Sequence, residues 1–190
     1  AGAYNHYSPS HIHQLLLRGE FLTAYTPYQP EISQGTLQAI FEYQSMICAL
    51  TGMEAANASH YDGATSMAEA VIMAYSHHRE KRKKVILSPA IHPQYREVVR
   101  TYTQGFGLNI VGDEDPKADL AQLVKLVDQD TAIFIVQSPN FFGQVENLEG
   151  LAAQVHAVGA LLCVAADPIS LGLLKPPGAY GADIVVGEGQ

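Results

Sequence analysis

The sequence contains few charged residues and only two cysteines, and each shortage excludes some classes of protein. Only 16% of its 190 residues are charged, which is sparse for a free-standing monomer and indicates that something else covers part of the exterior. The net charge of −8 argues against a nucleic-acid binder, because such proteins normally carry a basic face. Cys48 and Cys163 lie far apart in apolar stretches, so we expect reduced core residues and no disulfide framework.

Long hydrophobic runs and targeting signals are also missing. No apolar run approaches the roughly 20 residues that a helix needs to cross a bilayer. The amino end has no basic segment followed by a hydrophobic one, so neither a membrane span nor a signal peptide is predicted, and we expect a cytoplasmic protein. The chain opens on Ala1 and stops at Gln190 without a closing element, so we expect that both ends are cut from a longer protein.

The first 32 residues differ in character from the rest. They are polar, aromatic and rich in proline, with no helical or strand period, and they predict an N-terminal arm (1–32) with one short helix near residues 12–18. Residues 33–190 form the predicted domain. Its first helix is expected to start at the N-cap Ser33 and to end at Gly52. The buried stripe of this helix should consist of Leu37, Ile40, Phe41, Ile47 and Leu50.

Helices and strands alternate in the remainder. Several of the strands are apolar on both faces, which is typical of a mostly parallel sheet covered by helices on each side. We therefore predict one three-layer α/β domain. Ser66 and Glu69 are expected to form a capping box, and the basic run 79–84 to form a solvated last helical turn. The predicted helices are 65–82, 93–103, 120–127 and 148–158, and the strands are 84–88, 108–111, 132–137, 161–166 and 183–186.

Four segments near the expected carboxyl ends of strands, where ligands collect in such sheets, contain polar groups that the fold does not require. Gly63, Ala64 and Thr65 precede a helix, whose N–H groups and dipole favour a phosphate. His92 follows a strand and suits stacking on a planar ring, Asn140 follows another, and Asp167 ends an apolar strand. Each has a purely structural alternative: a capped helix start, a histidine cap, a turn, or a carboxylate paired with an arginine or a helix terminus.

In this order the four segments resemble the PLP-dependent enzymes of the aspartate-aminotransferase fold (PLP fold type I). The resemblance implies a phosphate loop at 63–65 and a ring-stacking residue at His92. It further implies an asparagine near the ring hydroxyl at Asn140 and an aspartate on the ring nitrogen at Asp167. The expected fold is accordingly the large domain of these enzymes, preceded by an arm.

A second resemblance is more specific. Segment 23–35, which reads TAYTPYQPEISQG, resembles the signature of glycine decarboxylase P-proteins, and residues 36–70 continue the likeness. The chain looks like the first subunit of the split form, equivalent to the N-terminal half of the fused form. In this family PLP is the electron sink for the decarboxylation of glycine, and the aminomethyl group passes to the lipoylated H-protein.

The lysine that holds PLP in these enzymes is expected on the turn after the strand 183–186. That turn, 187–190, contains no lysine, and Lys175 precedes the strand. The resemblance implies that this chain carries a degenerate site and that a lysine-bearing P-protein subunit carries the cofactor. The arm would then border the partner's active site and grip glycine and the PLP ring. The arm residues implied are Asn5, His6, Tyr25, Tyr28, Gln29 and Glu31.

Other interpretations remain open from the sequence. The chain is alternatively part of a self-sufficient PLP-dependent aminotransferase or lyase whose lysine follows Gln190. A non-catalytic Rossmann-like or scaffold domain is a second alternative, although no Gly-x-Gly-x-x-Gly follows a first strand. The pairs His11/His13 and His77/His78 lack a carboxylate or cysteine at matching spacing, so no metal site is predicted.

Overall fold

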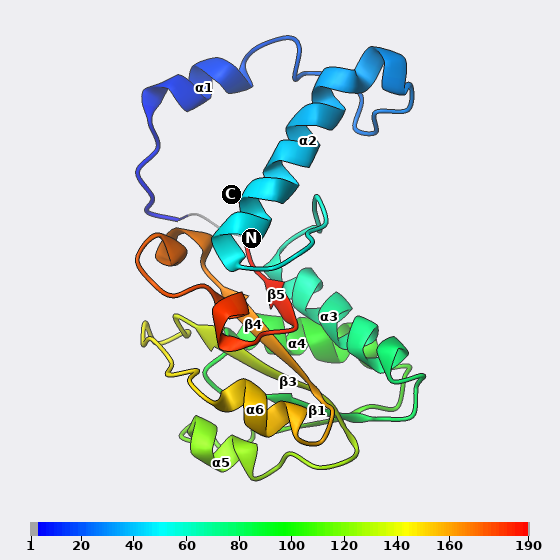
Figure 1. Cartoon of the computed structure of the whole chain (residues 1–190), viewed down its shortest axis with the longest axis vertical. Coiled ribbons are helices and arrows are strands. Elements are labelled where there is room, and N and C mark those ends of the chain that lie inside the picture. Colours follow the sequence, from blue (N-terminus) through cyan, green and yellow to red (C-terminus); the bar gives the residue numbers. More distant parts are fainter. Residues whose placement is uncertain (1–3, 190) are drawn as a thin grey trace.

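The computed structural model describes residues 4–189, and its centre is a five-stranded sheet (Figure 1). All neighbouring strands pair in parallel, in the order β2-β1-β3-β4-β5. This confirms the predicted α/β class with a parallel sheet. The strands are β1 Lys84–Leu87, β2 Asn109–Val111, β3 Thr131–Ser138, β4 Leu161–Ala166 and β5 Ile184–Val186.

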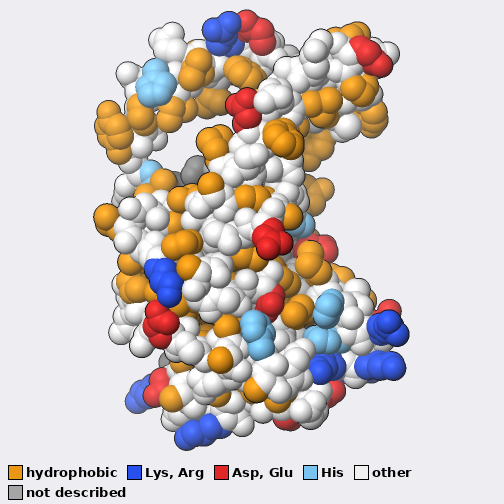
Figure 2. Space-filling view, viewed as in Figure 1, with side chains coloured by type: hydrophobic (Ala, Val, Ile, Leu, Met, Phe, Trp, Pro, Cys, Tyr) orange, Lys and Arg blue, Asp and Glu red, His pale blue; other side chains and the backbone are white. Residues whose placement is uncertain are grey.

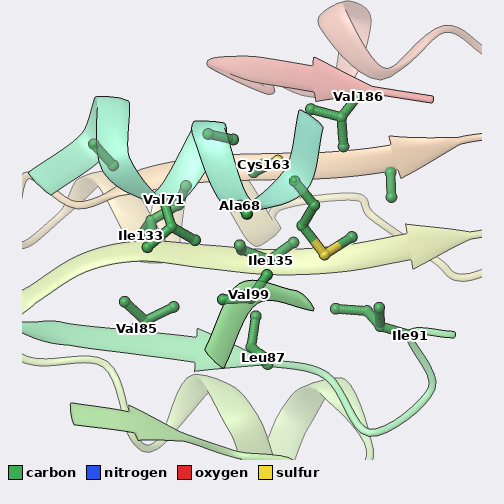
Figure 3. Packing of buried hydrophobic residues seen from close by; sticks show 14 residues of the cluster. Ala68, Val71, Val85, Leu87, Ile91, Val99, Ile133, Ile135, Cys163 and Val186 are labelled. Carbon is green, nitrogen blue, oxygen red and sulfur yellow. The ribbon is translucent and has the colours of Figure 1, made fainter. Parts of the chain in front are cut away.

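Alternate residues of the strands face two separate hydrophobic layers. On one face, Val85, Ile133 and Cys163 pack with helix α3 (Gly63–His77) and helix α4 (Pro93–Thr103), as Figure 3 shows. On the other face, Phe134 and Leu162 pack with helix α5 (Leu120–Val124) and helix α6 (Leu151–His156). Burying each large apolar side chain contributes roughly 1.5–3 kcal/mol to the stability of the fold. Because helices pack on both faces of the sheet, the three-layer prediction is confirmed.

Helix α3 starts and ends differently from the prediction. Its N-cap is Asp62, whose carboxylate accepts from the N–H of Thr65 (2.8 Å), while the Thr65 hydroxyl accepts from the N–H of Asp62 (3.1 Å). The predicted Ser66–Glu69 box is therefore wrong: an earlier residue caps the helix. The basic run is not a last helical turn either, because Arg79 and Glu80 adopt φ values of 53° and 61° and lead the chain towards β1.

An ion-pair cluster fixes α4 to the loop after β2. The carboxylate of Asp113, only 3% exposed, accepts from Arg96 Nη1 at 2.8 Å and from Arg100 Nη2 at 2.7 Å. Burial by itself raises the pKa of the Asp113 carboxyl. The two guanidinium groups outweigh this effect and hold its pKa below the ordinary value. Ion pairs thus stabilise the sheet domain in addition to its hydrophobic core.

The arm contains helix α1 (Ser10–Leu16), slightly earlier than predicted, and leads into the long helix α2 (Pro30–Thr51). Helix α2 begins before Ser33 because Pro30 stands at its first position, where a fixed φ and a missing N–H cost nothing. Its end at Gly52, in the left-handed conformation with φ 73°, confirms the predicted stop. Two 3₁₀ turns, η1 (Pro168–Gly172) and η2 (Pro177–Tyr180), connect β4 to β5.

The predicted buried stripe of α2 is wrong. Phe41 is 66% exposed, the other four stripe residues are only partly buried, and Thr51 is the one buried residue of the helix. The arm and α2 project from the sheet domain, and Figure 2 shows hydrophobic side chains gathered over them. We call this the arm–α2 surface. Its strongly exposed members are Tyr7, Leu16, Leu17, Phe21, Leu22, Tyr25, Tyr28, Ile32, Phe41 and Met46.

Both cysteines are free: Cys163 is buried in the core, as expected, and Cys48 is partly buried on α2. Burial raises the pKa of the Cys163 thiol to about 12. Among the helices of residues 4–189, none is long and apolar enough to cross a membrane.

Candidate functional site

The predicted polar segments meet at the carboxyl edge of the sheet. His92 follows β1, Asn140 follows β3 and Asp167 follows β4, and these three strands are neighbours. Glu188 follows β5, the next strand along, and contacts the first residue of α3. The parallel sheet therefore brings all four predicted segments to one edge, together with Glu188, which the sequence analysis did not single out.

The start of α3 is bound by the side chain of Glu188. The N–H of Gly63 donates to Glu188 Oε1 at 2.9 Å, and the hydroxyl of Tyr95 donates to the same oxygen at 2.8 Å. A Cβ atom at Gly63 would lie 2.6 Å from the Tyr95 hydroxyl and 3.1 Å from Glu188 Oε1, so a larger residue would displace the ends of these side chains. Glycine thus allows their close approach. The only sequence signal for Glu188 was an acid on the turn where a lysine was expected.

The other polar groups of the predicted phosphate loop are also bound within the chain. The carboxylate of Asp62 accepts from the N–H and from the hydroxyl of Thr65 (2.8 and 2.9 Å). These bonds, with a smaller contribution from the N–H of Ala64, lower the pKa of Asp62. The hydroxyl of Ser66 donates to the carbonyl of Gly63 at 2.8 Å. Two carboxylates therefore surround the start of α3.

Glu188 is charged and the tyrosines beside it are protonated. Burial by itself raises the pKa of Glu188, but the hydrogen bonds that it accepts, including those from Gly63 and Tyr95, bring it below the ordinary value. Burial and the Glu188 carboxylate raise the pKa of Tyr95. Tyr4 lines the cavity beside Tyr95, and its ring stacks on that of His6 with centroids 5.3 Å apart. The start of the arm thus lies at this pocket.

A cavity of about 650 Å³ opens beside this cluster, and His92 lies on its wall. His92 caps α4, since its Nδ1 accepts from the N–H of Gln94 at 3.2 Å. Its ring contacts the rings of Tyr95 and Phe141, with centroids 5.2 and 4.9 Å away. The lining residues are Tyr4, Asp62, Ala64, His92, Pro93, Gln94, Tyr95, Arg96, Glu97 and Val98.

Asn140 and Asp167 have structural partners. Asn140 is buried; its amide donates to Glu146 at 2.7 Å, and its carbonyl accepts from the N–H groups of Phe142 and Gln144 at 3.0 Å. Asp167 Oδ1 accepts from the N–H of Ile169 at 3.1 Å and caps η1. Each residue therefore organises the loop in which it lies.

The pocket does not fit PLP. Its anion-binding N–H groups are bound to the carboxylates of Glu188 and Asp62, and no lysine lines the cavity within residues 4–189. Lys175 binds Glu149 at 3.0 Å and lies 4.1 Å from the centroid of the Tyr180 ring. Nor does this part of the chain bring together three His, Cys, Asp or Glu side chains suited to a metal ion.

The predicted arm residues face mainly outward. Tyr28, Gln29 and Glu31 are exposed around the start of α2. Tyr25 is 96% exposed and borders only a shallow hollow of about 230 Å³, beside the loop 59–61. Asn5 is exposed and His6 partly buried. Tyr4, which the sequence analysis did not include, is the arm side chain that lines the main cavity.

Comparisons with known proteins agree with one another. The family model of the glycine cleavage system P-protein matches residues 1–190. Proteins named probable glycine dehydrogenase (decarboxylating) subunit 1 are 58% identical in Desulforamulus reducens and 54% identical in Thermomicrobium roseum. In both cases the match covers 100% of this chain and 43% of the relative, so the chain spans less than half the length of these relatives.

The similar solved structures extend this result to the fold. A crystal structure of glycine decarboxylase (P-protein) in inhibitor-bound form has a TM-score of 0.87 at 49% identity, over 100% of this chain and 42% of that one. An alanine–glyoxylate aminotransferase from Nostoc sp. has a TM-score of 0.62 at 19% identity, over 81% and 41%. At that identity the second similarity concerns the fold alone, which is that of PLP fold type I.

Proposed function

Because this chain belongs to the glycine cleavage system P-protein family, we propose that it is the subunit of glycine decarboxylase without the cofactor lysine. With a lysine-bearing P-protein subunit it forms the site where glycine is decarboxylated in glycine catabolism. The aminomethyl group passes there to lipoylated H-protein. The assembly is a cytoplasmic hetero-oligomer, and this chain alone is inactive.

One observation carries the proposal: the chain binds the donors of its own pocket with its own carboxylates and exposes its arm. The donors at the start of α3 are occupied by carboxylates, whereas Tyr25, Tyr28 and Glu31 face solvent. Such side chains suit glycine, because a carboxylate pairs with an ammonium group and a phenol donates to a carboxylate. Side chains that face outward in residues 4–189 are available to a site completed by further residues, and we propose that the lysine-bearing subunit supplies them.

The arm–α2 surface supports a permanent partner. Obligate subunit interfaces are large and apolar, and resemble a domain core cut in half. Phe21, Leu22 and Phe41 each have more than half of their side-chain area in contact with water, although they are of the type usually found in cores. A partner subunit that covers them gains the hydrophobic stabilisation of burying this surface.

In the proposed assembly, PLP held by the partner's lysine supplies the electron sink for the reaction. The roles of this chain are binding and orientation. Glu31 holds the ammonium end of glycine, and Tyr25 and Tyr28 donate hydrogen bonds to its carboxylate and pack against the ring. The exposed apolar side chains around them exclude water once the partner is in place.

Reconstitution tests the proposal. The full-length chain, a lysine-bearing P-protein subunit and lipoylated H-protein are assayed separately and together for glycine-dependent exchange of labelled CO2. We expect exchange only when both subunits are present. Full exchange by this chain with H-protein alone would show that the proposal is wrong.

Borohydride reduction in the presence of PLP locates the cofactor. We expect the reduced adduct on a lysine of the partner and none on this chain. An adduct on a lysine of this chain would instead identify the self-sufficient PLP enzyme. The Rossmann-like alternative no longer applies, because the P-protein family model matches the whole chain.

A further inference from the structure

The start of α3 has the properties of an anion site. The first four N–H groups of a helix have no partner within the helix, and the helix dipole adds partial positive charge. At α3, three of them are the N–H groups of Gly63, Ala64 and Thr65. The chain itself supplies the anions: Glu188 accepts from Gly63, and Asp62 accepts from Thr65 and is also stabilised by Ala64.

Glu188 comes from a distant part of the chain, which distinguishes it from an ordinary helix cap. It lies 125 residues from Gly63 in sequence, on the turn after β5. The hydroxyl of Tyr95, on α4, donates to the same carboxylate oxygen. Elements α3, α4 and the turn after β5 therefore converge on one carboxylate, whose position is set by the tertiary fold.

We propose that the Glu188 carboxylate is a built-in substitute for a phosphate: it occupies the anion position at the start of α3 and closes this pocket to phosphate and to phosphate esters. The proposal explains how a pocket with a glycine-lined helix start avoids competing for a phosphorylated cofactor. It stands independently of the proposed function, since it concerns only contacts within this chain.

Phosphate entry would meet two obstacles. It must displace Glu188 from the hydrogen bonds that Gly63 and Tyr95 donate, both strengthened by the carboxylate charge. The displaced carboxylate and Asp62 would then lie beside the phosphate as like charges. Removing the Glu188 side chain removes its competing hydrogen bonds and one of the two like charges, and Asp62 remains as the other. The N–H of Gly63 is then available to phosphate.

The test is isothermal titration calorimetry, in which the full-length chain is titrated with inorganic phosphate. The ionic strength is held constant with KCl. The variants are Glu188→Ser, which empties the position, and Glu188→Gln, which keeps the shape without the charge. Glu149→Ser, on an exposed loop, is the matched control. We expect Glu188→Ser to bind phosphate at least tenfold more tightly than the wild type and the control, and Glu188→Gln to lie between them.

Thermal melts give a second readout. We expect phosphate to raise the melting temperature of Glu188→Ser and to leave that of the wild type unchanged, because a ligand stabilises only the state that binds it. A crystal of Glu188→Ser soaked in phosphate should place the ion at the N–H of Gly63. If Glu188→Ser does not fold, Glu188→Gln carries the test. Phosphate binding by the wild type as tight as by these variants, or no gain in either variant, would overturn the proposal.

Discussion

Two regions of the chain differ in how far their side chains are buried: residues 4–51 leave most apolar side chains accessible to water, whereas residues 63–189 bury many of them. The first region has one buried residue, Thr51, whereas the 15-residue helix α3 alone has nine. Both regions contain helices with apolar residues at helical spacing. The difference is that α3 lies on a sheet and α2 projects from it (Figure 1). An apolar stripe on a helix therefore marks a face that is expected to be buried. The residues that bury it can belong to another molecule.

The strongest test of this comparison is a pair of truncations. Phe134, fully buried in β3, is replaced by alanine, and so is Leu22 of the arm, which is 72% exposed. We expect Phe134→Ala to lower the free energy of unfolding by about 3–5 kcal/mol, because it leaves a cavity. Leu22→Ala should change it by less than about 0.5 kcal/mol. Urea unfolding of the full-length chain without a partner measures both.

Equal losses for the two variants would contradict the difference between the two regions. They would mean that the arm packs on the sheet domain of its own chain in solution. A loss that appears for Leu22→Ala only after the partner is added would mean that the partner covers the arm.

The next prediction concerns the polar residues of the arm. In the proposed roles of these residues, Tyr28→Phe and Glu31→Gln each remove a hydrogen bond to a charged group, worth roughly 1.5–3 kcal/mol. Since each 1.36 kcal/mol is about tenfold in rate, turnover of glycine by the reconstituted complex should fall about ten- to a hundredfold. Melting temperatures should barely move, because both side chains are exposed.

Steady-state kinetics beside thermal melts decide this prediction. Glu20→Gln, another exposed arm carboxylate, serves as the control and should keep its turnover. Melts that drop sharply while turnover per folded complex holds would mean that Tyr28 and Glu31 are structural.

A smaller effect is expected for association. Phe41→Ala removes an exposed aromatic side chain from α2 and should weaken binding to the partner subunit at least about fivefold, corresponding to about 1 kcal/mol. Met73→Ala, equally exposed but on α3 of the sheet domain, is the control. Titration calorimetry with the partner measures both dissociation constants. Equal weakening by the two variants would show that the interface is not confined to the arm–α2 surface.

The smallest effect concerns pH and lies wholly within the sheet domain. The folded pKa of Asp113 is lowered below its unfolded value of about 3.9. Its ion pairs therefore stabilise the fold above about pH 4, and this contribution is lost as the pH falls through the folded pKa. We expect Asp113→Asn to cost about 1 kcal/mol at pH 7, because both arginines still reach water.

Urea unfolding from pH 7 to pH 2 measures the difference between Asp113→Asn and the wild type. The difference should be constant above about pH 4 and should shrink below it. A difference that stays constant to pH 2 would mean that charge is not what Asp113 contributes.

The sequence predicted the fold where local signals agree with tertiary packing. Helix 93–103 and strand 161–166 were predicted to the residue, because a proline starts the helix and an uninterrupted apolar run forms the strand. The start of α3 was missed because Asp62 and Ser66 are both good caps, and the choice between them depends on the surroundings. The α2 stripe was identified as a helical face, but periodicity cannot say whether the chain itself covers that face.

The candidate site was predicted in its placement but not in its partners. Segments that follow parallel strands must meet at one edge, so 63–65, His92, Asn140 and Asp167 could be located from topology. The bond between Gly63 and Glu188 joins residues far apart in sequence and depends on how α3 meets the turn after β5. The roles of the arm residues stay predictions, because they depend on a second chain.

The strand order also sets the timing of assembly during synthesis. Parallel neighbours cannot be joined by tight hairpins, and the edge strand β5 completes the sheet only after it has left the ribosome. At about 5–20 residues per second, the arm and α2 emerge roughly 7–28 seconds before the last described residues. Completion of the sheet does not cover their apolar side chains, which stay exposed until the proposed partner subunit binds. Pro9, Pro27 and Pro30 interrupt the segment and disfavour the strand pairing through which nascent chains aggregate.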